Sequence, residues 1–292
     1  MRLSAAILKT IAYADIFDYP LKRGEIWRFL IKQPTTYARF SLVLTRLEQE
    51  RAVVYNQGFY TLPKRKQLIV TRLQREKIFS KKIKQARFAA SILQLIPSVY
   101  FIGISGAVAM HNAPLEDDID FFIIAAGGKL WLTRLFCVLL MQICGLRRRP
   151  HASSVKDKIC LNMFMEARHL KLPQRERDLY SAHEIVQLLS VVNKCAMYEK
   201  FLTANHWVEN YLPHAFKKPV LNKSKKEKTF QSSLFLEKVS RRLQLWYMQR
   251  HLTSEVIHKH WLRFHPRDAR YWVKEEFQRR LKNLGLANSH KF

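Results

Sequence analysis

Two aspartates, Asp118 and Asp120, stand at the start of an apolar run that ends at Ile124. Successive side chains of a β-strand point to opposite faces, so both carboxylates are expected on one face, with Ile119 buried behind them. Two carboxylates on one face suit one or two Mg²⁺ ions, which in turn hold a triphosphate. Asp118 and Asp120 are therefore the candidate catalytic and metal-binding residues.

A glycine-containing segment precedes this pair. The β-prone run of residues 99–102 leads into Gly103-Ile104-Ser105-Gly106-Ala107, and a helix is expected to begin near Val108. A tight turn between a strand and a helix lets backbone N–H groups approach phosphates. The candidate nucleotide-binding residues are Gly103, Ser105, Gly106 and Ala107.

A third metal ligand is expected from a later strand. The run from Ile159 to Met165 is β-prone, and its alternation puts Cys160, Asn162 and Phe164 on one face. Asn162 then takes the third ligand position as a neutral oxygen donor. Glu166 would replace it only if the strand is longer or shifted in register.

The spacing of these residues resembles the active-site motif of the polymerase-β-type nucleotidyltransferase superfamily. In that motif, a Gly-Gly/Ser pair is followed by about ten residues and then by Asp-x-Asp. Here Gly106-Ala107 is followed by residues 108–117 and then by Asp118-Ile119-Asp120. The resemblance implies a small mixed-sheet domain and Mg²⁺-dependent transfer of a nucleoside monophosphate from a nucleoside triphosphate. Residues 99–213 also resemble bacterial and archaeal nucleotidyltransferase-domain proteins, a likeness that does not name the substrate.

The first 66 residues predict three helices and a hairpin. Ser4 is expected to cap the first helix, residues 21–31 form the second, and the third runs from after Pro34 to about Glu50. Two short β-prone runs flank Asn56-Gln57-Gly58, a hairpin turn signal. This order resembles a winged helix-turn-helix domain, which binds DNA or RNA in some proteins and packs or docks in others. The residues expected to contact nucleic acid are Arg39, Arg46, Lys64, Arg65 and Lys66.

The rest of the chain completes an α+β fold. Residues 67–98 predict a basic connecting helix, followed by a nucleotidyltransferase domain over residues 99–216 and a basic helical region over residues 217–292. Clustered lysines make residues 216–229 the expected linker. The predicted buried stripe of the connecting helix is Leu68, Leu73, Ile78, Ile83, Phe88 and Ile92.

The net charge of +28 lies on both flanks of a nearly neutral centre, because residues 99–216 carry 13 basic and 11 acidic side chains. Such flanks attract a polyanion and favour DNA or RNA as a partner. A generally basic proteome or a demand for solubility would produce the same excess.

Four cysteines without a CxxC pair favour buried thiols and a reducing, cytoplasmic location. The longest apolar run, residues 130–146, contains Arg134 and falls short of the roughly 20 residues that a membrane span needs. No membrane span and no secretory signal are therefore expected.

The sequence predicts a Mg²⁺-dependent nucleotidyltransferase associated with nucleic acid. Two alternatives stay open. Ala107 stands where the superfamily usually has serine, and Asn162 is a neutral ligand. The first alternative is therefore a protein of this fold without turnover that binds nucleic acid or has a regulatory role. In the second alternative the acceptor of the nucleotide is a protein or a small molecule, and the N-terminal module serves only as a docking element.

Overall fold

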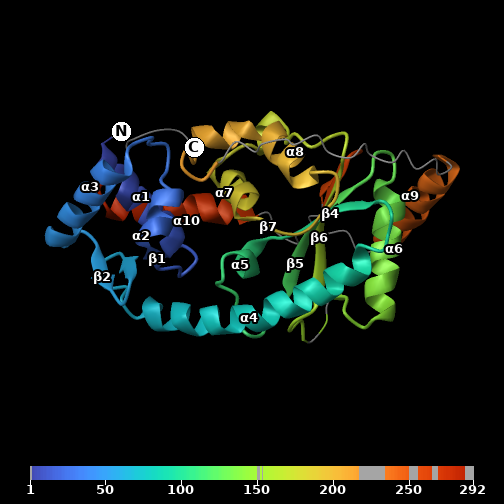
Figure 1. The fold of residues 1–292 in the computed structure, drawn as a ribbon, viewed down its shortest axis with the longest axis horizontal. Helices are drawn as coiled ribbons and strands as arrows, with labels where there is room; N and C mark the ends of the chain where they lie inside the picture. Colours follow the sequence, from blue (N-terminus) through green and yellow to red (C-terminus); the bar gives the residue numbers. More distant parts are fainter. Residues whose placement is uncertain are drawn as a thin grey trace.

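The structure, a computed structural model, describes residues 2–149, 152, 154–216, 234–249, 256–264 and 269–286. Its architecture is α+β, with a three-stranded antiparallel sheet and a six-stranded mixed sheet. The small sheet and helices α1 to α3 lie at one end of the molecule, and the large sheet lies toward its centre (Figure 1).

The N-terminal module contains three helices and the small sheet, whose strand order is β1-β3-β2. Its elements are α1 (Leu3–Asp15), β1 (Leu21–Lys22), α2 (Arg23–Arg28), α3 (Tyr37–Gln49), β2 (Val54–Asn56) and β3 (Phe59–Thr61). The predicted hairpin is confirmed, with Gln57 and Gly58 in the left-handed region at its turn. Thr36 caps α3 by accepting a hydrogen bond from the backbone N–H of Arg39.

Two local predictions in this module are wrong. Helix α1 begins at Leu3, one residue before Ser4, and no side chain caps it. The second helix starts at Arg23, because Leu21 and Lys22 pair with β3 as an edge strand. Pairing with a strand almost 40 residues away overrides the local helical pattern at Leu21.

The predicted connecting helix is confirmed as α4 (Leu68–Leu93), but its predicted buried stripe is only partly correct, because Ile83 and Ile92 pack against the core and other members do not. Leu73 and Phe88 are 37% and 57% exposed. Most neighbouring residues of the predicted stripe are five positions apart. Five positions correspond to a rotation of about 140° around a helix, so these residues do not all lie on one face. The buried positions are instead Ile69, Arg72, Lys82, Ala86, Ala89, Ala90 and Leu93. Small alanines let this long helix lie close to the large sheet.

The large sheet has the strand order β7-β4-β5-β6-β9-β8. Its strands are β4 (Val99–Ile104), β5 (Ile119–Ala125), β6 (Ile159–Glu166), β7 (Leu189–Asn193), β8 (Val256–Ile257) and β9 (Trp261–Arg263). Strands β5 and β6 pair in parallel, and the other neighbours pair antiparallel.

Helices cover both faces of this sheet (Figure 1). The remaining elements are α5 (Gly106–Ala109), α6 (Leu130–Ile143), α7 (Leu179–Gln187), α8 (Met197–Ala204), α9 (Leu234–Gln249), α10 (Ala269–Asn283) and the 3₁₀ helices η1 (Gln174–Glu176) and η2 (His206–Asn210). Residues of α4, α6 and α9 share one apolar core with the sheet, and residues of α1, α7, α8 and α10 share the other.

The C-terminal region differs from the all-helical prediction. Strands β8 and β9 extend the large sheet beside β6, α9 packs on α6, and α10 reaches back to α1. In that last contact Arg280 donates a 2.9 Å hydrogen bond to the Asp15 carboxylate. Residues 217–229 of the predicted linker lie outside the described residues.

Candidate functional site

The turn between β4 and α5 brings the backbone against an aspartate. Gly106 has a φ of +65°, which favours glycine, and a Cβ atom added there would lie 2.9 Å from Oδ2 of Asp120. The Ser105 N–H donates a 3.0 Å hydrogen bond to the Asp120 carbonyl. Glycine therefore allows the turn and the Asp120 carboxylate to meet.

The other two predicted nucleotide-binding residues lie on either side of this turn. Gly103 belongs to β4, where an added Cβ atom would lie 2.7 Å from the ring of Phe101. Ala107 lies in the first turn of α5, which begins two residues before the predicted start. Gly103 therefore makes room for the Phe101 side chain within the sheet. One residue, Ile104, separates it from the turn that begins at Ser105.

Asp118 and Asp120 converge as predicted. Their carboxylates and the thiol of Cys160 offer three atoms that all lie within 4.8 Å of one another. The Asp118 side chain is only 10% exposed. Burial, and then the negative charge of Asp118, raise the pKa of Asp120 to about 7. Two acidic groups thus share a poorly solvated end of the sheet.

Arg148 supplies a cation to this pair. Its Nη1 atom donates a 2.7 Å hydrogen bond to Oδ2 of Asp118 and lies 3.7 Å from the Cys160 sulfur. The sequence predicts a solvated charge run or a polyanion contact for Arg147 to Arg149, so it did not point to this contact. The contact arises because the residues that follow α6 return alongside the start of β6.

A buried lysine holds the loop that carries the acids. Lys82 of α4 is fully buried, and its ammonium donates to the carbonyl of Asp117 at 2.6 Å and to that of Leu115 at 3.1 Å. It also contacts the Asp157 carboxylate at 3.1 Å. The burial of Lys82 could not be predicted from hydrophobic periodicity, because a cation does not fit the apolar pattern of a buried helix face.

Strand β6 carries an extra residue beside the acids. Asp120 pairs with Cys160 but Phe122 pairs with Met163, so two residues of β6 face one residue of β5 between these pairs. The predicted alternation is therefore interrupted, and Phe164 lies on the opposite face from Cys160, in the core shared with α4 and α6. The prediction that placed Phe164 with Cys160 is wrong.

Asn162 lies within this bulge and is buried. It lines a cavity together with Ser105, so the two predicted site residues come from neighbouring parts of the sheet and turn. Glu166, the alternative third ligand, pairs with Ala125 five positions along β5 from Asp120. At a rise of roughly 3.3 Å per residue, that separation is about 16 Å. Glu166 therefore stands apart from the acid pair.

Glu184 of α7 is a further acidic residue near the turn, and it was not among the predicted site residues. It lines the cavity that contains Ser105 and a second cavity that contains Gly106 and Ala107. Burial raises the pKa of Glu184 to about 7, and its charge contributes to the raised pKa of Asp120. Only the packing of α7 against the turn brings this carboxyl close to the pair.

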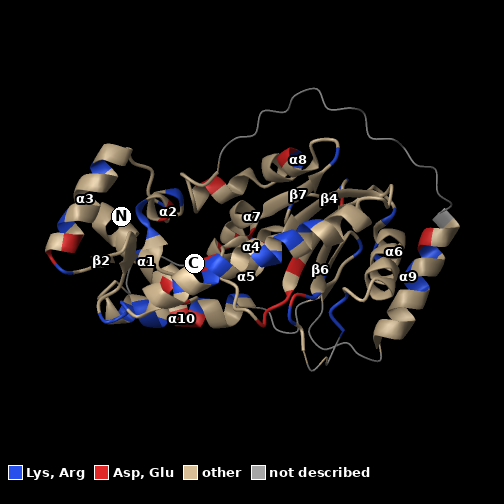
Figure 2. Cartoon of the chain, turned by 60° about the horizontal axis from the view of Figure 1, so that its bottom comes forward, with Lys and Arg blue, Asp and Glu red and all other residues tan. Residues whose placement is uncertain are grey.

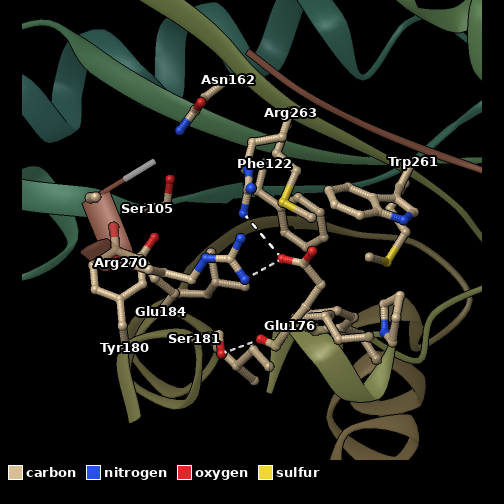
Figure 3. A pocket seen from close by; sticks show the side chains of 18 residues that line it. Ser105, Phe122, Asn162, Glu176, Tyr180, Ser181, Glu184, Trp261, Arg263 and Arg270 are labelled. Carbon is tan, nitrogen blue, oxygen red and sulfur yellow. Dashed lines mark hydrogen bonds and ion pairs between the residues drawn. The ribbon is translucent and has the colours of Figure 1, made fainter. Parts of the chain in front are cut away.

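The first cavity, the one that contains Ser105 and Asn162, has walls that are mostly apolar. Arg263 and Arg270 both point at the carboxylate of Glu176 (Figure 3). The second cavity lies between the N-terminal module and the turn. Both cavities adjoin the glycine turn, the first through Ser105 and the second through Gly106 and Ala107, and neither Asp118 nor Asp120 lines either of them.

The residues expected to contact nucleic acid differ in their surroundings. Arg39 is exposed on α3, and Arg46 is exposed with a 2.7 Å contact to Glu50. Lys64 and Lys66 are also exposed. Arg65 instead binds two carboxylates of its own module, Asp15 at 2.9 Å and Asp18 at 2.5 Å.

Other basic side chains lie along α4, α9 and α10 (Figure 2). The exposed cations of α4 recur at helical spacing on its solvent side and are Lys77, Lys81, Lys84 and Arg87. This row was part of the predicted charge excess.

Comparisons of the chain with protein-family models, curated proteins and solved structures found no match. Among the residues that the structure describes, no helix combines the length and apolar character needed to cross a membrane.

Proposed function

We propose that this chain is a nucleotidyltransferase that moves a nucleoside monophosphate from a nucleoside triphosphate to an acceptor hydroxyl. The observation that carries the proposal is the meeting of Asp118 and Asp120 with the turn at Gly106, at the end of a mixed sheet. We also assign the N-terminal module to the winged helix-turn-helix class, because a hairpin follows its three helices and an edge strand completes the sheet.

The donor set suits Mg²⁺ through its oxygen atoms. Magnesium binds carboxylates together with water and substrate phosphates, so two aspartates meet the usual protein share of its ligands. The Cys160 thiol is a soft donor and lies outside that set. Mg²⁺ bound by Asp118 and Asp120 would neutralise charge on the triphosphate.

The chain's own residues position the reactants. Asp118 and Asp120 supply the anionic anchor, and Ser105, Gly106 and Ala107 form the turn that faces the phosphates. The acceptor hydroxyl loses its proton to water, and its oxygen bonds to the α-phosphorus. The bond from that phosphorus to its bridging oxygen breaks, and pyrophosphate leaves. Apolar walls around the turn keep water from competing with the acceptor.

A nucleotide-binding titration tests the proposal. Calorimetry with ATP, CTP, GTP and UTP in the presence of Mg²⁺ is expected to find one nucleotide that binds the unaltered chain. Asp118→Asn and Asp120→Asn should each lose this binding and the release of pyrophosphate. Glu116→Gln is the matched control, because Glu116 belongs to the same loop but is 70% exposed. Unchanged pyrophosphate release in Asp120→Asn would overturn the proposal.

A second function keeps the fold without turnover. The ion pair between Arg148 and Asp118 favours it, because a resident cation already neutralises one of the two acids. The protein would then bind nucleic acid through its basic surfaces, including the exposed row on α4. Binding of labelled DNA and RNA would weaken steeply with salt and would be unaffected in Asp118→Asn or Asp120→Asn.

Reversing the charge of Lys77 and Lys84 separates the two functions. The doubly substituted chain, Lys77→Glu with Lys84→Glu, should lose nucleic-acid binding if the α4 row carries it. Nucleotide binding at the acids should stay the same in that chain. Salt-insensitive binding of nucleic acid by the unaltered chain would remove this second function.

A further inference from the structure

A second set of metal-ligating side chains lies at the other end of β6 from the acid pair. Glu166 ends β6, His169 follows in the next turn, and His260 directly precedes β9. One ligand atom from each of these residues lies within 4.8 Å of the other two. We call this set the Glu166–His169–His260 cluster.

The distances within the cluster resemble those around a tetrahedral ion. Oε2 of Glu166 lies 2.9 Å from Nδ1 of His260 and 4.0 Å from Nδ1 of His169. Zinc–nitrogen and zinc–oxygen bonds of about 2.1 Å place tetrahedral ligand atoms roughly 3.4 Å apart, between these two values. The two imidazole rings stack with centroids 3.5 Å apart and planes 10° apart. Ligation therefore needs a rotation of the rings, which the 47% exposure of the His169 side chain permits.

The carboxylate is held in place by the backbone around it. Glu166 is buried, and its Oε1 atom accepts a 2.8 Å hydrogen bond from the N–H of Gly128. Its own backbone N–H donates to the His260 carbonyl, and the His169 N–H donates to the Glu166 carbonyl, each at 2.9 Å. These bonds fix one ligand and bring both histidines to it. In metal sites, hydrogen bonds of this kind orient the ligand residue and raise the affinity for the metal.

We propose that the Glu166–His169–His260 cluster binds a divalent transition ion of the zinc type. Two imidazoles and one carboxylate suit Zn²⁺, whereas Mg²⁺ prefers oxygen donors alone. Three protein ligands leave one position for water. This site is independent of the proposed nucleotide chemistry, because it shares no residue with Asp118 and Asp120.

The ion would connect two distant parts of the chain. His260 belongs to the C-terminal region, and Glu166 and His169 belong to the central domain, so one ion would bind β9 to β6. Strand β9 carries Trp261 and Arg263, which line the first cavity. Metal binding therefore stabilises one wall of that cavity.

Cobalt provides the test, because Co²⁺ in a tetrahedral nitrogen–oxygen site absorbs visible light. Excess Mg²⁺ is included to occupy the acid pair. Under this condition, the visible absorbance of the chelator-treated full chain is expected to saturate at one Co²⁺ per chain, and one equivalent of Zn²⁺ should abolish it. His169→Ala should weaken Co²⁺ binding by about 100-fold, on the order of the largest losses seen when the surroundings of a metal site are altered. Because His169 is nearly half exposed, this variant is expected to fold, and circular dichroism checks that it does.

Two controls locate the ion. His258→Ala removes a histidine two residues from His260 that contacts Arg175 and Trp261 and lies outside the cluster, so Co²⁺ binding should persist. Asp118→Asn combined with Asp120→Asn should also leave it unchanged. A Co²⁺ spectrum that survives in His169→Ala, that disappears in the double aspartate variant, or that never develops in the unaltered chain would overturn the proposal.

Discussion

The guanidinium of Arg148 donates a 2.7 Å hydrogen bond to Oδ2 of Asp118. The acid pair at the start of β5 thus has a cationic partner. A divalent ion bound by Asp118 and Asp120, as proposed above, would meet the positive charge of Arg148 at close range, so the arginine and the ion would compete for the same carboxylate. We therefore expect Arg148 to lower the affinity of the pair for metal.

Arg148→Gln is expected to tighten Mn²⁺ binding at the acid pair by about 5-fold, because an interaction near 1 kcal/mol is typical of a partly exposed charge pair. Electron paramagnetic resonance counts free Mn²⁺ during a titration and measures this change. Arg149→Gln removes a neighbouring charge that is exposed and should leave the affinity nearly unchanged. Weaker Mn²⁺ binding in Arg148→Gln would mean that the arginine supports the site.

Gly106→Ala is expected to displace the Asp120 carboxylate, because the new Cβ atom would lie 2.9 Å from Oδ2 in a backbone with φ of +65°. We expect the free energy of unfolding to fall by about 1–2 kcal/mol and Mg²⁺-dependent nucleotide binding to fall at least about 10-fold. Gly285→Ala is the control, since its φ is +66° and an added Cβ atom meets nothing within 4 Å. Equal nucleotide binding by the two variants would contradict the role of the contact.

Lys82→Met is expected to destabilise the chain by about 2–4 kcal/mol, because it leaves two carbonyls and a carboxylate without their buried cation. Lys81→Met tests the same carboxylate from outside: Lys81 also contacts Asp157 at 3.1 Å, but its side chain is 63% exposed. That variant should lose less than about 1 kcal/mol. Urea unfolding measures both values, and similar losses would show that burial of Lys82 contributes little.

Glu184 makes stability depend on pH. Its pKa is raised from 4.5 to about 7 in the folded chain, so the folded state holds a proton that the unfolded state releases between these values. Stability therefore falls as pH rises through this window. Between pH 5 and pH 8, Glu184→Gln should gain about 1–3 kcal/mol relative to the unaltered chain.

Urea unfolding at several pH values measures this difference. Glu209→Gln, whose carboxyl is exposed, should follow the pH dependence of the unaltered chain. Parallel curves for Glu184→Gln and the unaltered chain would show that Glu184 is solvated in the folded state.

The sequence alone determined the features that follow from local geometry. Alternation along a strand placed Asp118 and Asp120 on one face, and the structure brings their carboxylates together. The turn after β4, the hairpin around Gly58 and the long helix α4 were also predicted. Each of these features depends on the conformational preferences of residues that are adjacent in the sequence.

Only the tertiary structure decided which charged groups meet. Arg148 reaches Asp118, Lys82 supports the loop before it, and His260 arrives beside Glu166 from more than 90 residues away. From a local pattern a charged residue is predicted to be exposed, because the pattern does not show which distant segment will pack over it. The cost of burying a charge is then offset by a partner that sequence spacing does not identify.

The same reason explains the wrong predictions about faces. Leu73 was expected inside and Phe88 with it, yet α4 turns its alanines and Lys82 toward the sheet. Phe164 changed faces because one extra residue in β6 shifted the alternation. Periodicity tells which residues share a face, but close packing between elements decides which face is buried and where a bulge interrupts the period.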